Sequence, residues 1–266
     1  MLNEGDIYLG TVAIEPQRWA GLVGDTEPGP LVEVSAHLGH IAAAGFDGVK
    51  LWERHLTEAG PDEVDRILAS TPPVAIFNSY TSLDDPDPAG RDAVAAWVGR
   101  TGADGVKFNV GNDASSEGAY VERIAAWLDA LPESTSLLCE CHFGISIAED
   151  STTAARIFDA AGPAGRLGAI VHTHDDPDYL RSKFDAYGDR IRHVHVNFLD
   201  FANGGAPRLG EIRDDLEAKF ELLRSLGFGG TWTIEFCHGL LTENDQAEFL
   251  VQQAIEDLGV LREVLA

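Results

Sequence analysis

Four short apolar runs in the second half of the chain each end in side chains that can bind a metal ion. They span residues 137–142, 169–174, 191–197 and 231–237. In a β-strand, alternate side chains lie on the same face. The groups that would share a face are Glu140 with His142, His172 with His174, His193 with His195 and Asn197, and Thr233 with Glu235 and Cys237. If the four strands are neighbours in one parallel sheet, these groups converge at its carboxyl ends, and we predict that they form one divalent-metal site.

One ligand from each run gives the set Glu140, His172, His195 and Glu235. Two carboxylates and two imidazoles suit Mn²⁺, Co²⁺, Fe²⁺ or Zn²⁺, whereas Mg²⁺ prefers oxygen ligands and retained water. A single Glu or His at a strand end is commonly a solvated carboxylate or a packed, hydrogen-bonded imidazole. Burying four such groups together is costly unless they are paired or bound to metal, so the set favours a metal site over packing.

Strand-like runs alternate with helical stretches along the whole chain. We expect strands at residues 7–14, 49–52, 73–80, 106–110, 136–141, 168–172, 190–197 and 231–236, and helices at 30–44, 61–69, 88–100, 117–130, 152–161, 176–187, 209–226 and 245–265. Eight strand-then-helix units with short connections predict an α/β fold, a single (β/α)8 TIM barrel domain over residues 1–266. The alternative is an open doubly wound sheet, but no Gly-x-Gly-x-x-Gly follows the first strand to support a dinucleotide site.

The composition is strongly acidic and excludes several classes of partner. Lys and Arg number 19 against 44 Asp and Glu, a formal net charge of −25. This charge argues against nucleic acid and against anionic membrane surfaces as partners. There is no apolar stretch of about 18 residues and no basic segment followed by an apolar one at the start, so neither a membrane span nor a secretory signal is expected. With three cysteines, an odd number, we expect reduced thiols and a cytoplasmic location.

Four segments resemble motifs of the xylose isomerase-like barrel superfamily, which includes sugar isomerases and epimerases, inosose dehydratases and endonuclease IV. Gly45-Phe46-Asp47-Gly48-Val49-Lys50-Leu51-Trp52-Glu53 is similar to its second strand, and Glu140-Cys141-His142 to its Glu-Asn-His at strand five. Arg192-His193-Val194-His195 matches its His-Val-His at strand seven, and residues 227–235 resemble its last strand, which ends in Glu. The resemblance covers the chain from the first strand to the eighth.

The family's metal ligands are Glu, Asp, His and Glu from strands five to eight. Carried over, these are Glu140, the strand-six position, His195 and Glu235. Strand six departs from the pattern, because the family's Asp followed by His three residues later is here His172 followed by Asp175. The shell loses one negative charge, which lowers its affinity for hard ions, and His174 is an alternative ligand. We expect Mn²⁺, with Co²⁺, Fe²⁺, Zn²⁺ or Mg²⁺ as the other candidates.

The resemblance implies a metal-dependent isomerase or epimerase of a small sugar or keto-sugar. In such epimerases the strand-five and strand-eight glutamates, here Glu140 and Glu235, bind metal and flank the substrate carbon. One removes a proton next to a carbonyl and the other returns it from the opposite face, by way of an enediolate. His142 is a further candidate base. If it is the base, loss of a leaving group would make the protein a lyase or dehydratase of a keto-sugar, keto-glycoside or inosose.

Two other functions are kept in view. A nuclease of the endonuclease IV type needs a basic face and more histidines on the second and third strands, and the net charge disfavours it. A non-catalytic sugar-binding barrel would keep its function without the two glutamates. The expected partner is a small carbohydrate substrate. A homo-oligomer is also possible, because members of the resembled family often pair through their barrels.

Further polar and aromatic residues at the expected strand ends could contact substrate. Lys107 and Asn109 share a face of the fourth strand, although a lysine there could equally extend its ammonium to solvent. Arg208 follows a Gly-rich loop and could hold a hydroxyl, carboxylate or phosphate. The full set of expected substrate contacts is Lys107, Asn109, Glu53, His174, Asn197, Arg208 and Trp52. On strand alternation, Cys237 could also line the site.

Overall fold

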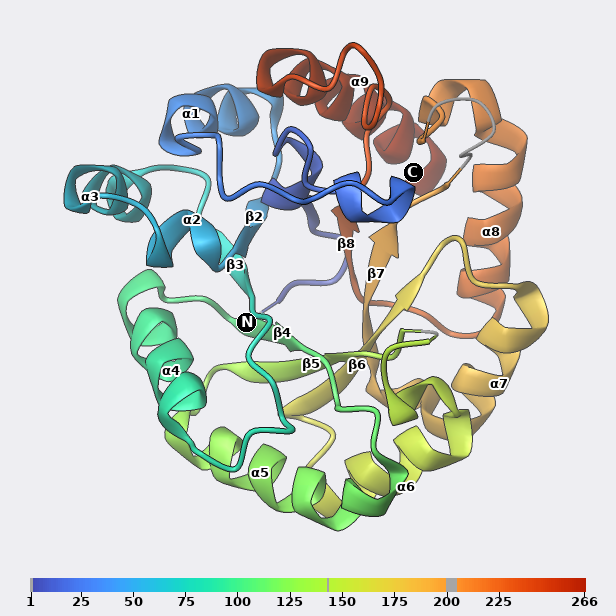
Figure 1. Cartoon of the computed structure of the whole chain (residues 1–266). Helices are drawn as coiled ribbons and strands as arrows, with labels where there is room; N and C mark the ends of the chain where they lie inside the picture. The colour runs from blue at the N-terminus through green and yellow to red at the C-terminus, as the bar shows by residue number, and fades with distance from the viewer. Residues whose placement is uncertain (1, 143, 200–204) are drawn as a thin grey trace.

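The structure is a computed structural model that describes residues 2–142, 144–199 and 205–266. Eight parallel strands follow one another in sequence order and close into a barrel, with β8 paired to β1 (Figure 1). They are β1 (Ile7–Gly10), β2 (Gly48–Trp52), β3 (Val74–Asn78), β4 (Gly105–Phe108), β5 (Ser136–Glu140), β6 (Leu167–His172), β7 (Ile191–Val196) and β8 (Thr231–Ile234). The predicted (β/α)8 barrel is confirmed.

Helices form a ring around the barrel (Figure 1). The α-helices are α1 (Ser35–Ala44), α2 (Arg54–Thr57), α3 (Pro61–Ala69), α4 (Ala89–Thr101), α5 (Glu117–Ala130), α6 (Ser151–Ala161), α7 (Pro177–Tyr187), α8 (Arg213–Ser225) and α9 (Ala247–Leu265). The 3₁₀ turns are η1 (Thr11–Ala13), η2 (Ala20–Val23), η3 (Ala114–Ser116), η4 (Ile147–Glu149), η5 (Gly188–Arg190) and η7 (Leu209–Ile212). Within the described residues, no helix combines the length and apolar character that crossing a membrane requires.

The structure corrects some predicted boundaries at the carboxyl side of the barrel. The first strand ends at Gly10, because residues 11–13 turn into η1. Residues 30–34 are not helical, and α1 begins at Ser35. The short α2 directly after β2 was not predicted, and residues 209–212 form η7 before α8 begins. As a result, residues 11–34 form a long, mostly irregular connection between β1 and α1.

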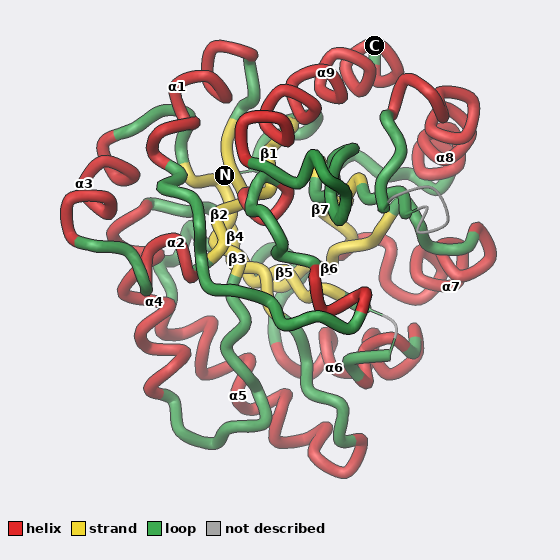
Figure 2. Tube along the Cα trace, turned by 45° about the horizontal axis from the view of Figure 1, so that its top comes forward, coloured by secondary structure: helices red, strands yellow, loops and turns green. Residues whose placement is uncertain are grey.

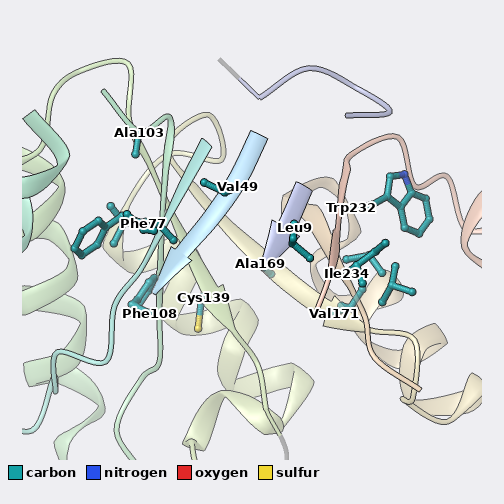
Figure 3. Close-up of a cluster of buried hydrophobic side chains, with 14 of the residues drawn as sticks. Leu9, Val49, Phe77, Ala103, Phe108, Cys139, Ala169, Val171, Trp232 and Ile234 are labelled. Atoms are coloured by element: carbon teal, nitrogen blue, oxygen red, sulfur yellow. The ribbon is translucent and has the colours of Figure 1, made fainter. Parts of the chain in front are cut away.

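The two faces of the strands pack into different cores. Side chains on the outer face, such as Leu9, Phe108, Cys139 and Trp232, pack with the helices in one large apolar cluster (Figure 3). Side chains inside the barrel form a small second cluster of Tyr8, Ala75, Ile76, Leu138 and Ile170. Residues 138 and 170 each lie two positions before a predicted metal ligand on the same strand, so those ligands continue the interior face toward the carboxyl ends.

Candidate metal centre

The four predicted ligands come together inside the carboxyl end of the barrel. Glu140, His172, His195 and Glu235 are buried, and each offers a ligand atom within 4.8 Å of those of the other three. Strand register explains the meeting, because His172 pairs with His195 across β6 and β7, and His195 pairs with Thr233, two residues before Glu235. Figure 2 shows loops crossing in front of the strands near this end.

The two histidines contact the two glutamates directly. Nε2 of His172 lies 3.2 Å from Oε1 of Glu140. Nδ1 of His195 lies 3.1 Å from the same oxygen and 3.0 Å from Oε2 of Glu235. One ring nitrogen cannot donate along both directions, and neither nitrogen of His195 has a hydrogen-bond partner among the described residues. Two carboxylates and two imidazoles, with the His195 nitrogens unsatisfied, fit a divalent ion that accepts nitrogen ligands.

A buried lysine pairs with each glutamate on the side away from the histidines. Nζ of Lys107 lies 2.8 Å from Oε2 of Glu140, and Nζ of Lys50 lies 2.9 Å from Oε1 of Glu235. Asn109 donates to Oε2 of Glu140 at 3.2 Å, and Asn197 donates to Oε2 of Glu235 at 3.0 Å. Each carboxylate therefore offers one oxygen to the imidazoles and holds a lysine on the other.

These pairings decide the charge of the glutamates. Burial alone would raise the pKa of Glu140, but the Lys107 ammonium and the two imidazoles outweigh it and hold that pKa well below its usual range. Burial would likewise raise the pKa of Glu235, and His195 together with Lys50 lowers it well below its usual range. Both groups are carboxylates at neutral pH, the form that binds metal.

Burial also decides the charge of His172. Burial, together with the neighbouring His195, lowers the pKa of this imidazole to about 4 against the opposing effect of Glu140. His172 is neutral at physiological pH, as a metal-binding imidazole must be. The two carboxylates of the centre lie beside the buried side chains of Lys50 and Lys107.

Asp175, which follows His172 where the resembled family has His, lies behind the four ligands. Its Oδ2 accepts a hydrogen bond from the backbone N–H of His172 at 3.3 Å and pairs with the buried Lys183 at 2.8 Å. The distance from Nδ1 of His172 to that oxygen is 4.0 Å. His172, His174 and Asp175 also have ligand atoms within 4.8 Å of one another, so His172 belongs to both groups.

A cavity of about 440 Å³ opens onto the centre. Of the predicted site residues, those that line it are Glu140, Glu235, His142, Lys107, Asn109, His174 and Asn197. His142 also makes ring contacts with His172 and His174, at 5.3 and 6.1 Å between centroids. The structure therefore brings these seven side chains together around one space.

The structure does not bring three predicted substrate contacts into this cavity. Glu53 turns back to Ser79 and the backbone N–H of Tyr80. Trp52 is buried under the guanidinium of Arg18. Arg208 donates from Nε to Gln253 of α9 at 2.9 Å.

Cys237 is also placed differently from the prediction. It packs in the outer apolar core, because β8 ends at Ile234 and strand alternation no longer holds three residues later.

Two residues that matter at the site were missed. Lys50 interrupts the apolar strand Gly48–Trp52, and an unpaired lysine is seldom buried there, so this interruption was the available signal. Arg18 lines the cavity and lies over the rings of Trp19, Trp52 and Tyr80. Its position depends on the irregular connection after β1, and the sequence has no periodic pattern there that would have revealed it.

No family model and no curated protein sequence matches this chain. Solved structures do match. The crystal structure of the IolI protein with a bound zinc atom is 12% identical, covers 97% of this chain and 98% of its own, and has a TM-score of 0.64. A xylose isomerase domain protein from Alicyclobacillus acidocaldarius is 15% identical over 97% of this chain and 99% of its own, with a TM-score of 0.62.

The 3-keto-D-glucoside 4-epimerase YcjR from E. coli, in its apo form, is also similar. It is 15% identical over 98% of this chain and 100% of its own, with a TM-score of 0.57. At this level of identity the likeness shows a common fold. It confirms, for the fold, the resemblance to xylose isomerase-like barrels that the strand motifs indicated.

Proposed function

We propose that this protein is a divalent-metal-dependent isomerase or epimerase of a small sugar or keto-sugar. The observation that carries the proposal is the buried set Glu140, His172, His195 and Glu235, whose two glutamates line a cavity at the carboxyl end of the barrel. This is where barrel enzymes hold their active sites. The similar folds of a zinc-binding protein and of a 3-keto-D-glucoside 4-epimerase support it.

In this proposal the four residues hold the ion, and the two glutamates also move protons. The ion would supply Lewis-acid polarisation of a substrate carbonyl. Glu140 and Glu235 are ionised, so each can accept a proton from a substrate carbon. Their lysine partners make them weak bases, so the C–H bond must be acidified by an adjacent carbonyl. This requirement favours a keto-sugar over an unactivated polyol.

Lys107 has a defined role beside Glu140 in this proposal. Burial acts to lower the pKa of Lys107, but the carboxylate of Glu140 outweighs it and the pKa is raised. The ammonium therefore stays protonated and faces the cavity. It can donate a hydrogen bond to the substrate oxygen that gains negative charge as the proton leaves.

The ion is proposed to be one that accepts imidazole nitrogen. Mn²⁺ is expected from the resemblance, and Co²⁺, Fe²⁺ and Zn²⁺ suit two histidines equally well. Mg²⁺ is disfavoured, because the strand-six carboxylate is replaced by His172 and both remaining carboxylates already pair with lysines. Elemental analysis of the purified protein checks this directly.

Solvent-deuterium exchange tests the function. Incubation of metal-loaded protein with a panel of keto-sugars in D₂O should place deuterium at a carbon next to the carbonyl. Glu140→Gln and Glu235→Gln should each lower exchange by about 10²- to 10⁴-fold. Glu63→Gln, which changes a buried glutamate of α3, is the matched control. The proposal would be contradicted if the purified protein carries no metal, is unaffected by chelators and exchanges no hydrogen with solvent. If the protein is a non-catalytic sugar-binding barrel, Glu140→Gln and Glu235→Gln should leave its affinity for sugar unchanged.

A lyase is the second candidate, and the position of His142 favours it. His142 lines the cavity two residues beyond Glu140 and adds a third proton-transfer group there. With His142 as base, proton abstraction from a keto-sugar, keto-glycoside or inosose would end in loss of a leaving group. Product mass decides, since an isomer has the mass of its substrate and an elimination product does not.

A further inference from the structure

The exposed large apolar side chains gather at the mouth of the cavity. Among the described residues, the large apolar side chains that are exposed are Leu22 (54%), Val23 (58%), Leu31 (57%), Tyr80 (45%), Ile145 (49%) and Leu199 (37%). Four of these six line the cavity that holds the metal-competent centre. Single exposed apolar residues are ordinary, but a contiguous group marks a binding surface.

We call these four, together with Trp19 and Phe236 on the same wall, the apolar rim. Its members come from five connections at the carboxyl ends of the strands. Trp19 and Leu22 follow β1, and the other four follow β3, β5, β7 and β8. The cavity therefore has a charged floor and an apolar upper wall.

The aromatic members of the rim are held in place by their neighbours. The rings of Trp19 and Phe236 pack edge to face with centroids 4.6 Å apart. Arg18 lies over the rings of Trp19 and Tyr80, donates to the Tyr80 hydroxyl at 3.1 Å and pairs with Glu27 at 2.6 Å. Binding to this wall would need little ordering of side chains.

The apolar lining also continues away from the floor. Trp19, Leu22, Leu199 and Phe236 line a small adjoining hollow as well, with Leu240 and Leu241. An apolar group that leaves the charged floor would meet these apolar side chains, with the Arg18–Glu27 ion pair beside them.

From this arrangement we infer that the substrate is a sugar that carries an apolar substituent, such as an aryl group, held by the rim while the sugar ring lies on the charged floor. The inference rests on the proposed function and names its substrate class. A sugar without such a substituent has no apolar group to cover the rim, so the rim would stay exposed to water while the sugar's polar groups contact the floor. A cavity of about 440 Å³ lies within the range of about 300–1,000 Å³ that accepts drug-sized ligands. A protein partner seated on the rim would close the entrance to the floor.

Paired ligands test the inference. Binding of phenyl and methyl β-D-glucopyranosides, and of phenyl and methyl β-D-xylopyranosides, is measured by calorimetry on zinc-loaded protein. We expect the phenyl compound of at least one pair to bind about tenfold or more tightly than its methyl partner, the scale on which apolar pockets discriminate. Leu22→Ser and Leu199→Ser should remove most of that preference. Val23→Ser and Leu31→Ser change exposed apolar residues outside the cavity and should keep it.

The outcomes separate the inference from the function. If no phenyl compound is preferred, or if none of the four glycosides binds, the inference is overturned. It is also overturned if light scattering finds a dimer that Leu22→Ser or Leu199→Ser dissociates, since the rim would then be an interface. Deuterium exchange on unsubstituted keto-sugars without any phenyl preference would leave the proposed function intact. A phenyl preference without exchange on any keto-sugar would contradict the function and leave the rim as a binding site.

Discussion

Replacing Lys50 by Met tests whether the lysines are the charge partners of the centre. Nζ of Lys50 is fully buried and lies 2.9 Å from Oε1 of Glu235. Its removal takes away the ammonium that pairs with this buried carboxylate and leaves it in contact with His195 and Asn197, close to the like charge of Glu140. Breaking a buried ion pair from one side costs about 3–5 kcal/mol. We expect Lys50→Met to lower the free energy of unfolding by this amount when the protein is kept in EDTA.

Metal should reverse part of this loss relative to the parent protein. A ligand at 100 times its Kd stabilises a folded protein by about 2.7 kcal/mol. With the positive charge of Lys50 gone, Glu235 should bind a divalent cation about tenfold or more tightly, which adds about 1.4 kcal/mol at the same concentration. Zinc should therefore stabilise Lys50→Met more than it stabilises the parent protein.

The assay is urea unfolding followed by circular dichroism, with EDTA or with zinc, together with calorimetric zinc titration of the folded proteins. His55→Leu is the control, because it removes the imidazole that contacts the buried Glu15 outside the metal centre and leaves that carboxylate with the backbone N–H of Leu31. It should destabilise the protein without any extra gain from zinc. The reasoning is refuted if Lys50→Met loses less than about 1 kcal/mol in EDTA, or if zinc stabilises both variants and the parent protein equally.

Three further predictions concern other parts of the chain. His172→Asp adds a third carboxylate to the centre and should favour Mn²⁺ over Zn²⁺ by about tenfold or more relative to the parent protein. Competitive metal binding measures this preference, and an unchanged preference would show that residue 172 is not a ligand. Burial raises the pKa of Asp257 to about 7, above its unfolded value near 4, so the unfolding free energy should fall by about 1.4 kcal/mol per unit as pH rises between these values. Asp257→Asn should flatten that slope, and a slope that persists in thermal unfolding from pH 4 to 8 would assign it to other groups. A Cβ at Gly230 would lie 2.1 Å from the backbone oxygen of Arg192, so Gly230→Ala should destabilise the barrel by about 1–3 kcal/mol. Gly259 lies in an open position of α9, so Gly259→Ala should stabilise the protein by about 0.5–1 kcal/mol. Equal melting temperatures of the two variants would count against the close approach at Gly230.

The sequence predicted what depends on the period of the strands. Alternation within runs that end in His and Glu is enough to place Glu140, His172, His195 and Glu235 on the interior face, and eight strand–helix units are enough for a closed barrel. Alternation stops where a strand stops. Cys237, three residues after β8, was therefore misplaced. Separately, residues 30–34 were wrongly assigned to a helix.

Contacts between distant segments could not be predicted in this way. Whether Lys107 reaches solvent or pairs with Glu140 depends on which strand lies beside β4, and this is known only once the register is known. Arg208 and Glu53 lie beyond strand ends, where hydrogen bonds to Gln253 and to Ser79, 45 and 26 residues away in the sequence, decide their direction. The three rings around Arg18 come from three separate stretches of chain, and no local pattern joins them.

The origin of the cavity walls has a consequence for how this protein can change. The charged floor is built from strand ends that the hydrogen-bonded barrel fixes, whereas the apolar rim is carried by connections outside the strands. Substitutions at Leu22, Ile145 or Leu199 leave the barrel ladder untouched. Selection, or an engineer who exchanges residues 18–27 for another segment, can therefore alter which compounds enter while the reacting groups keep their places. On the proposed function, substitutions in the rim would therefore change which substrate binds without moving the residues that carry out the chemistry.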